Sequence, residues 1–267
     1  MAYREKTYRS DNYIEHEILF RGRYGAKGEK RSPRKKASSE QIQKQNQRNR
    51  ENRLRRTAQL NFYPNDIFLT LKYPAGTRKK LEEVEKDIKK FQDGMRKDYK
   101  TRGEEFKWIK RIEIGKNGGI HAHFIINRIY GAELLISKNW PYYSHYASIT
   151  EEGGMEKLVN YMCKEIPEEV KTKEKQLSFL ELEEIERCVK YSTSRNLIRP
   201  EPEVKEFRRK TVRKYMEDDP QPEKGFYIDK GSIVRGINPY TGLSYITYRE
   251  IRQNVITRKI RLPARRE

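Results

Sequence analysis

His121 and His123 are the residues of the chain best suited to bind a metal ion. They lie two positions apart in the apolar, β-branched run 120–126, and the 267 residues contain only four histidines. Residues two apart in a β-strand project from the same face, so both imidazoles would point to one side. Neutral imidazole is a common metal ligand. Two histidines on one strand face can also be purely structural, and the pair alone leaves both interpretations open.

Glu113 is the third expected ligand. Residues 106–114 mix β-branched, aromatic and charged side chains, as does a strand with one face open to solvent, and 115–119 (Gly-Lys-Asn-Gly-Gly) has the composition of a hairpin turn. An antiparallel hairpin around this turn places Glu113 opposite His121, and a register shift of two residues would keep it on the histidine face. Two imidazoles and a carboxylate suit Mg²⁺, Mn²⁺ or another divalent cation. The alternate residues Ala122, Phe124 and Ile126 are expected in the core.

A tyrosine on a predicted helix supplies a candidate nucleophile. Lys157, Tyr161 and Lys164 are spaced three or four apart and share one helix face. Positive charge on both sides would lower the pKa of the Tyr161 hydroxyl and favour its attack on an anionic phosphodiester. A solvated face with ordinary lysines gives the same pattern and stays open as an interpretation. The helix itself is predicted by an apolar stripe at spacings of three and four: Met155, Leu158, Val159, Met162, Cys163 and Ile166.

The order of three motifs resembles that of the HUH endonucleases. It is most similar to the single-tyrosine rolling-circle replication initiators (Rep proteins) of bacterial plasmids and phages. The motifs are the strand 66–73 (Asp-Ile-Phe-Leu-Thr-Leu-Lys-Tyr), the pair His121-Ala-His123, and Tyr161 followed three residues later by Lys164. Residues 190–200 also resemble a stretch that follows the catalytic helix in such proteins. The resemblance therefore covers residues 60–200 of this chain.

This resemblance implies a metal-dependent DNA nickase. In the family, two histidines and a nearby polar or acidic residue hold a divalent metal that polarises the scissile phosphate, and the tyrosine attacks it. Carried over, His121 and His123 are metal ligands with Glu113 as the third, Tyr161 is the nucleophile, and Lys164 positions the phosphate or supports the metal site. The products would be a free 3′-OH and a 5′-phosphotyrosine link that allows later rejoining. The implied partners are single-stranded or origin DNA, a separate helicase and a DNA polymerase.

Charge also favours a nucleic-acid partner. The chain has a net charge of +20, and residues 21–56 alone hold fourteen Lys or Arg against three acids. A second basic cluster runs from Arg252 to Arg266. Such regions attract phosphate backbones, with binding that weakens steeply as salt rises. Charge does not separate DNA from RNA, but the eighteen tyrosines and nine phenylalanines include candidates for stacking on unpaired bases.

The element pattern predicts an α+β fold with an antiparallel sheet of four or five strands packed on helices. The resemblance implies a ferredoxin-like or RRM-like core. We expect a basic N-terminal arm and polar helix over 1–60, the endonuclease domain over 61–200, and a C-terminal extension with a β-like segment and basic tail over 201–267. Further expected elements are an edge strand in 1–20, a helix over 39–60 capped by Ser39, a helix after a Thr77 cap that includes Leu81 to Met95, a short helix and a strand in 128–150, a helix over 179–189, and strands at 226–229 and 243–248 around a turn at 238–242.

Several absences narrow the function. The sequence has no Gly-x-x-x-x-Gly-Lys-[Ser/Thr] loop, so an attached ATP-driven helicase is not expected. Two cysteines, Cys163 and Cys188, indicate neither a disulfide framework nor a zinc site. No apolar run approaches the ~20 residues of a membrane span, and there is no signal-peptide core. A bacterial, cytoplasmic location without membrane partners is therefore expected.

Alternative functions remain at this stage. Conjugative relaxases usually place the tyrosine before the histidines, whereas Tyr161 follows His123 by 38 residues. A single-tyrosine HUH transposase keeps the motif order, although the basic arm and C-terminal extension count against it. A non-catalytic nucleic-acid-binding protein with structural histidines belongs to a different class. If Tyr161 is not the nucleophile, Tyr191 is the first alternative.

Overall fold

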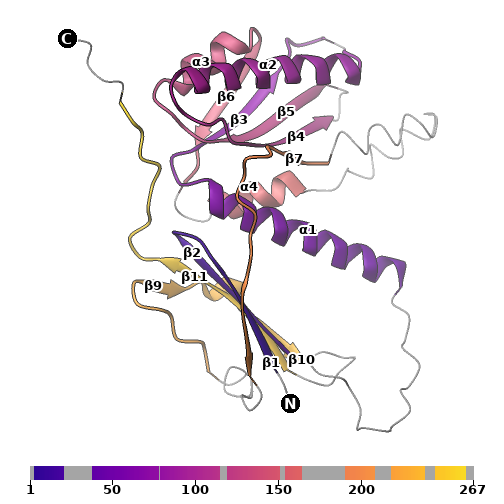
Figure 1. Ribbon diagram of the computed structural model, residues 1–267. Helices are drawn as coiled ribbons and strands as arrows, with labels where there is room; N and C mark the ends of the chain where they lie inside the picture. The colour runs from indigo at the N-terminus through magenta and orange to yellow at the C-terminus, as the bar shows by residue number, and fades with distance from the viewer. Residues whose placement is uncertain are drawn as a thin grey trace. The chain divides into compact units, whose positions relative to one another are not determined.

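A computed structural model describes residues 3–20, 38–77, 79–114, 119–150, 154–163, 190–207, 218–237 and 244–262 (Figure 1). The chain divides into two compact units, Met1–Asn49 with Arg199–Ile256 and Arg50–Ile198 with Thr257–Glu267. The elements in chain order are β1 (Tyr3–Arg9), β2 (Tyr13–Phe20), α1 (Ser39–Asn61), β3 (Ile67–Lys72), α2 (Leu81–Thr101), β4 (Trp108–Ile114), β5 (Ile120–Ile126), α3 (Ala132–Asn139), β6 (Tyr143–Ser148), α4 (Gly154–Cys163), β7 (Ser192–Thr193), β8 (Glu203–Phe207), β9 (Phe226–Ile228), the 3₁₀ turn η2 (Lys230–Ser232), β10 (Val234–Ile237) and β11 (Ser244–Arg252).

The second unit contains a five-stranded sheet in the order β6-β3-β5-β4-β7, and every pairing is antiparallel. Helices α2 and α3 cover one face, while α4 and the later part of α1 cover the other (Figure 1). The predicted α+β fold with an antiparallel sheet of four or five strands is confirmed.

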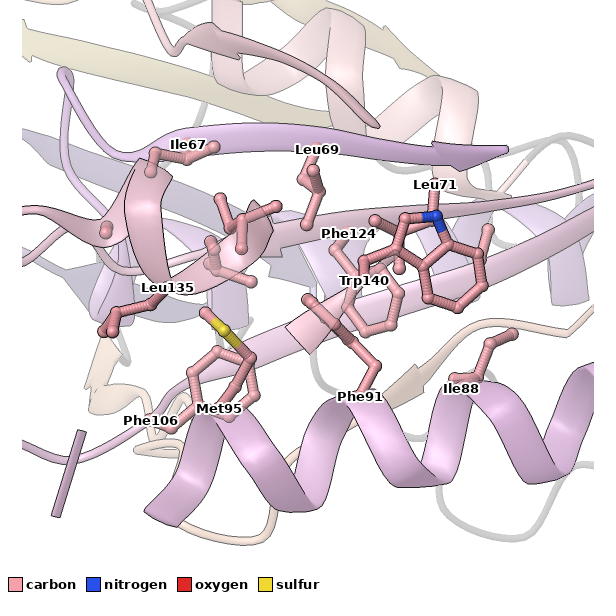
Figure 2. Packing of buried hydrophobic residues seen from close by; sticks show 14 of the residues in the cluster. Ile67, Leu69, Leu71, Ile88, Phe91, Met95, Phe106, Phe124, Leu135 and Trp140 are labelled. Atoms are coloured by element: carbon pink, nitrogen blue, oxygen red, sulfur yellow. The ribbon is translucent and has the colours of Figure 1, made fainter. Parts of the chain in front are cut away.

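Strand alternation builds the larger core of this unit. Ile67, Leu69 and Leu71 of β3 point toward α2, whose apolar stripe includes Ile88 and Phe91 (Figure 2). Ala122, Phe124 and Ile126 of β5 lie in the same core, as predicted. Burying each large side chain contributes about 1.5–3 kcal/mol, which fixes α2 against the sheet.

The start of α2 differs from the prediction. Its N-cap is Lys80 rather than Thr77, and the Glu83 carboxylate accepts the Lys80 N–H at 3.0 Å. Thr77 instead closes a turn, with its N–H donating to the carbonyl of Pro74 at 3.1 Å. A side-chain oxygen that matches the cap preference was therefore overruled by a capping acid farther along the chain.

Helix α1 has two different halves. It spans Ser39–Asn61, as predicted, but the Oγ atom of Ser38, not Ser39, accepts the N–H of Gln41 at 3.2 Å. Leu54 and Ala58 are buried against the sheet face that also carries α4. The helix is consequently polar and exposed only in its earlier part, and its end belongs to the core of the second unit.

The Asp66 carboxylate anchors the start of β3. It is fully buried and forms an ion pair with Arg258 at 2.8 Å, and it also accepts the N–H of Arg128 at 2.7 Å. Because a buried carboxylate needs charged or hydrogen-bonding partners, Arg258 ties the segment after β11 into the second unit.

The first unit contains a six-stranded sheet in the order β10-β11-β2-β1-β8, with β9 also pairing with β11. The expectation of an edge strand in residues 1–20 is wrong, because these residues form two strands that both lie inside the sheet. β1 pairs with β8 and β2 pairs with β11. These partners come from the far end of the chain, so no local pattern in 1–20 could have indicated them.

The remaining expected elements have mixed outcomes. The short helix and strand in 128–150 are confirmed as α3 and β6, and the strands at 226–229 and 243–248 are confirmed as β9 and β11. The helix predicted over 179–189, the turn at 238–242, Ile166 and Cys188 lie outside the described residues. None of the described helices is long and apolar enough to cross a membrane.

Candidate active site

The β4–β5 hairpin has the predicted register. Glu113 pairs with His121 across the ladder, and Arg111 pairs with His123. Side chains that pair directly share a sheet face, so Glu113, His121 and His123 lie on one side. Oε2 of Glu113 lies 3.0 Å from Nε2 of His123, which is the diagonal neighbour rather than the directly opposed histidine.

Two rows of residues cross this face of the sheet from β6 to β4. The inner row consists of His145, Thr70, His123 and Arg111, and the outer row consists of Tyr143, Lys72, His121 and Glu113. Beside the inner row, Phe68 and Ile125 meet the core formed by α1 and α4. The two rows therefore lie where the helix cover of this face ends.

Helix α4 brings Tyr161 to these residues. Met155, Val159 and Met162 form the buried stripe that holds the helix on the sheet, as predicted. The Tyr161 hydroxyl donates to Oε2 of Glu113, and its oxygen lies 2.9 Å from Nε2 of His123. A tyrosine, a carboxylate and an imidazole thus meet in one hydrogen-bonded cluster.

The predicted effect of lysines on Tyr161 is wrong for the described residues. Burial and the hydrogen bond to Glu113 raise the pKa of the Tyr161 hydroxyl. The exposed Lys157 does not appear among the causes, and Lys164 lies outside the described residues. Helix-face spacing indicated the lysines but could not show that the hydroxyl turns toward a carboxylate.

Two residues of the inner row were missed by the sequence analysis. The Oγ1 atom of Thr70 lies 3.1 Å from Nδ1 of His123, on the side of the ring away from Glu113. Nη1 of the buried Arg111 donates to the carbonyl of Tyr161 at 2.6 Å and ties α4 to the sheet. Hairpin parity contained a signal for Arg111, because it lies opposite His123, whereas the β3–β5 pairing that supplies Thr70 has no local signature.

Aromatic packing fixes the ring planes of the cluster. Phe68 stacks parallel to His123 at a centroid distance of 5.9 Å, and Tyr161 meets His123 edge-on at 5.0 Å. Because three rings restrict one another, the Tyr161 oxygen is held at the edge of the imidazole.

The charge states of the expected metal ligands suit cation binding. Hydrogen bonding to His123 and Tyr161 lowers the pKa of Glu113 to about 2, so it is a carboxylate at neutral pH. Burial and the positive charge of Lys72 lower the pKa of His121, which keeps its imidazole neutral. Neutral imidazole and carboxylate are the forms that bind metals.

The arrangement of these ligands is not that of a formed metal site. Among the described residues, no group of three or more His, Cys, Asp or Glu side chains is placed to hold a metal ion. Glu113 and His123 contact each other and Tyr161. The donor set fits a divalent cation in chemistry, and these contacts would have to be exchanged for a shared one.

The segment that carries the cluster is similar to a known family. Residues 66–170 match the family model of the ORF2-type replication-associated protein. The matched segment of this chain contains β3 to α4 and therefore Thr70, Glu113, both histidines and Tyr161. The match to this replication-associated family supports a role in replication initiation, with DNA as the partner. Comparisons with curated proteins and with solved structures gave no significant match.

Proposed function

We propose that the chain is a rolling-circle replication initiator that nicks single-stranded DNA at an origin, with Tyr161 as nucleophile. The observation that carries the proposal is the contact of the Tyr161 hydroxyl with Glu113 and His123, inside the segment similar to the replication-associated family. A hydroxyl beside a carboxylate and an imidazole has partners that can accept its proton as it attacks.

The chemistry follows from these groups. The Tyr161 oxygen attacks the scissile phosphorus, its proton passes to Glu113 or His123, and the bond to the 3′ oxygen breaks. One product strand ends in a 3′-OH, and the other is linked to Tyr161 through its 5′ phosphate. Attack of a 3′-OH on this phosphotyrosine reverses the step and rejoins a strand.

We assign the metal-binding role to His121, His123 and Glu113, with Mg²⁺ or Mn²⁺ as the cation. A bound divalent cation would act as a Lewis acid that withdraws charge from the scissile phosphate. Lys164, three residues after Tyr161, is proposed from the sequence motif to position that phosphate. The free 3′-OH would prime a DNA polymerase, and strand separation would need a separate helicase, because the sequence has no ATP-binding loop.

A labelled-strand assay tests this proposal. Single-stranded DNA of randomised sequence, labelled at its 3′ end, is incubated with the full chain and Mn²⁺ and separated under denaturing conditions. Label that migrates with the protein is expected, because the 5′ phosphate of the downstream fragment is joined to tyrosine. The same DNA labelled at its 5′ end should release a shortened strand that a polymerase can extend.

Four controls give the assay its meaning. Tyr161→Phe and EDTA should each abolish the adduct, Glu113→Gln should reduce it, and Tyr191→Phe should leave it unchanged. An adduct that survives in Tyr161→Phe and disappears in Tyr191→Phe would move the nucleophile to Tyr191. DNA binding without any adduct would favour the non-catalytic alternative.

A further inference from the structure

The face that carries the Tyr161 cluster continues onto an exposed edge strand. Tyr143 and His145 of β6 pair with Lys72 and Thr70 of β3, so their side chains are on the same face as His121 and His123. Tyr143 is 67% exposed and His145 is also exposed. Within the described part of the chain, neither side chain makes a hydrogen bond, an ion pair or a ring contact. Two ring systems therefore face solvent beside the candidate site.

Helix cover explains why these rings are open. The residues that α1 and α4 bury on this face include Ile109 and Ile125, which lie beside the inner row. The outer row is more open, since Lys72 and Tyr143 are exposed and His121 and Glu113 are partly exposed. An open strip thus runs from the rings of β6 to the ligand cluster.

The strip also has a positive charge in the right position. Lys72 lies between Tyr143 and His121 in the outer row, and its charge is felt by the His121 imidazole. A lysine at this position can bind a backbone phosphate next to the one that Tyr161 would attack.

We propose that Tyr143 and His145 form a stacking subsite for the unpaired bases next to the scissile phosphate of single-stranded DNA, with Lys72 binding the phosphate between. Side chains two apart on a strand are separated by about 7 Å, and exposed rings on a sheet face stack successive unpaired bases in other nucleic-acid-binding folds. The location of the scissile phosphate rests on the proposed nicking function. The subsite extends that function by specifying where the strand approaches and why it must be unpaired.

Binding to a non-cleaving variant tests the subsite apart from the chemistry. Tyr161→Phe is the background for all proteins, EDTA is present, and the probe is a fluorescent oligo-dT of about 15 nucleotides. Its dissociation constant is measured by anisotropy over a series of salt concentrations. Tyr143→Ala has a matched control in Tyr146→Ala, which is on the same strand but on the opposite face, opposite Leu69. Tyr146 is 43% exposed, so it is a comparable tyrosine.

Tyr143→Ala is expected to weaken binding about 5- to 100-fold at every salt concentration, and Tyr146→Ala less than about twofold. Lys72→Gln should instead reduce the slope of log affinity against log salt by about 0.7, the value for one phosphate contact on a single strand. Lys97→Gln, an exposed lysine on α2, should leave the slope unchanged. Circular dichroism spectra matching the parent would show that each variant is folded.

Three results would overturn the subsite. Equal effects of Tyr143→Ala and Tyr146→Ala would show that the ring on the site face has no special role. An equal loss of binding to duplex DNA in Tyr143→Ala would exclude base stacking. A Tyr143-dependent preference for oligo-rU over oligo-dT would replace DNA by RNA. None of these results depends on adduct formation, so failure of the nickase and failure of the subsite are distinguishable.

Discussion

Glu113 faces His121 across the β4–β5 ladder, but its carboxylate contacts His123, with Oε2 3.0 Å from Nε2. The same carboxylate oxygen accepts the Tyr161 hydroxyl. Glu113 is therefore the residue shared by the candidate nucleophile and the expected metal ligands. His121 is next to this cluster and, within the described residues, is not one of its hydrogen-bond partners.

Replacing Glu113 by Gln should uncouple the two roles. The amide keeps the shape of the side chain but loses the negative charge, so Mn²⁺ affinity should fall by at least about tenfold. Isothermal titration calorimetry of the Tyr161→Phe background with and without Glu113→Gln measures this difference. Glu82→Gln, in the first turn of α2, is the control and should bind Mn²⁺ like the parent. Unchanged affinity in Glu113→Gln would remove this residue from the ligand set.

Thr70 is expected to orient His123. Thr70→Val keeps the side-chain shape but removes the oxygen 3.1 Å from Nδ1, which frees the ring to rotate or change tautomer. Loss of such a supporting contact typically costs about 10- to 100-fold in metal affinity or activity. The rate of adduct formation should fall in Thr70→Val and recover in Thr70→Ser. Equal rates in the parent and Thr70→Val would leave Thr70 with a packing role only.

Arg111 is expected to hold the helix end that carries Tyr161. Arg111→Met keeps length but leaves the Tyr161 carbonyl without its donor, so the free energy of unfolding should fall by about 1–3 kcal/mol. Urea unfolding followed by circular dichroism measures the loss. Arg111→Lys should recover part of the stability but less of the adduct rate, since a shorter donor positions α4 differently. A variant as stable and as active as the parent would contradict the anchoring role.

Lys72 should control the titration of His121 in metal-free protein. Burial and the Lys72 charge hold the pKa of His121 below its ordinary value, so the unfolded chain binds a proton first and stability declines as pH falls through about 6.5. Lys72→Gln should raise the His121 pKa toward its ordinary value and reduce that decline. NMR titration of the histidine ring protons, assigned with His121→Gln, follows this directly. A His121 pKa that is unchanged or lower in Lys72→Gln would contradict the interaction.

Cys163 should be unreactive in the folded protein. Burial raises the pKa of its thiol to about 12, so at about pH 8 it is protonated as well as inaccessible. Iodoacetamide followed by peptide mass spectrometry should find Cys163 unmodified in native protein and modified in guanidinium chloride. Rapid native alkylation would mean that α4 detaches from the sheet on the timescale of the reaction.

The part of the site that lies within one hairpin was predictable from the sequence. A Gly-rich turn and strand parity were enough to place Glu113 opposite His121, because both constraints act over a few residues. The apolar stripe of α4 was likewise readable. The contact between Tyr161 and Glu113 was not, since it depends on how α4 packs across β4 and β5, and helix-face spacing pointed to the lysines instead.

Strand neighbours distant in sequence were the other gap. The place of β6 beside β3 brings Tyr143 and His145 to the site face, yet β6 is an exposed, polar strand with no alternating pattern. Pairing of β1 with β8 and of β2 with β11 was equally hidden, because hydrogen bonds between backbones carry little sequence information. These pairings required the three-dimensional structure.

The sheet of the first unit joins the first strands to leave the ribosome to some of the last. A nascent chain halted before Ser244 would already contain Glu113, both site histidines and Tyr161, but it would lack β11, the partner of β2. It would also lack Arg258, which neutralises the buried Asp66 carboxylate. A frameshift late in the gene would thus remove structural support from both units while leaving every proposed reactive group intact.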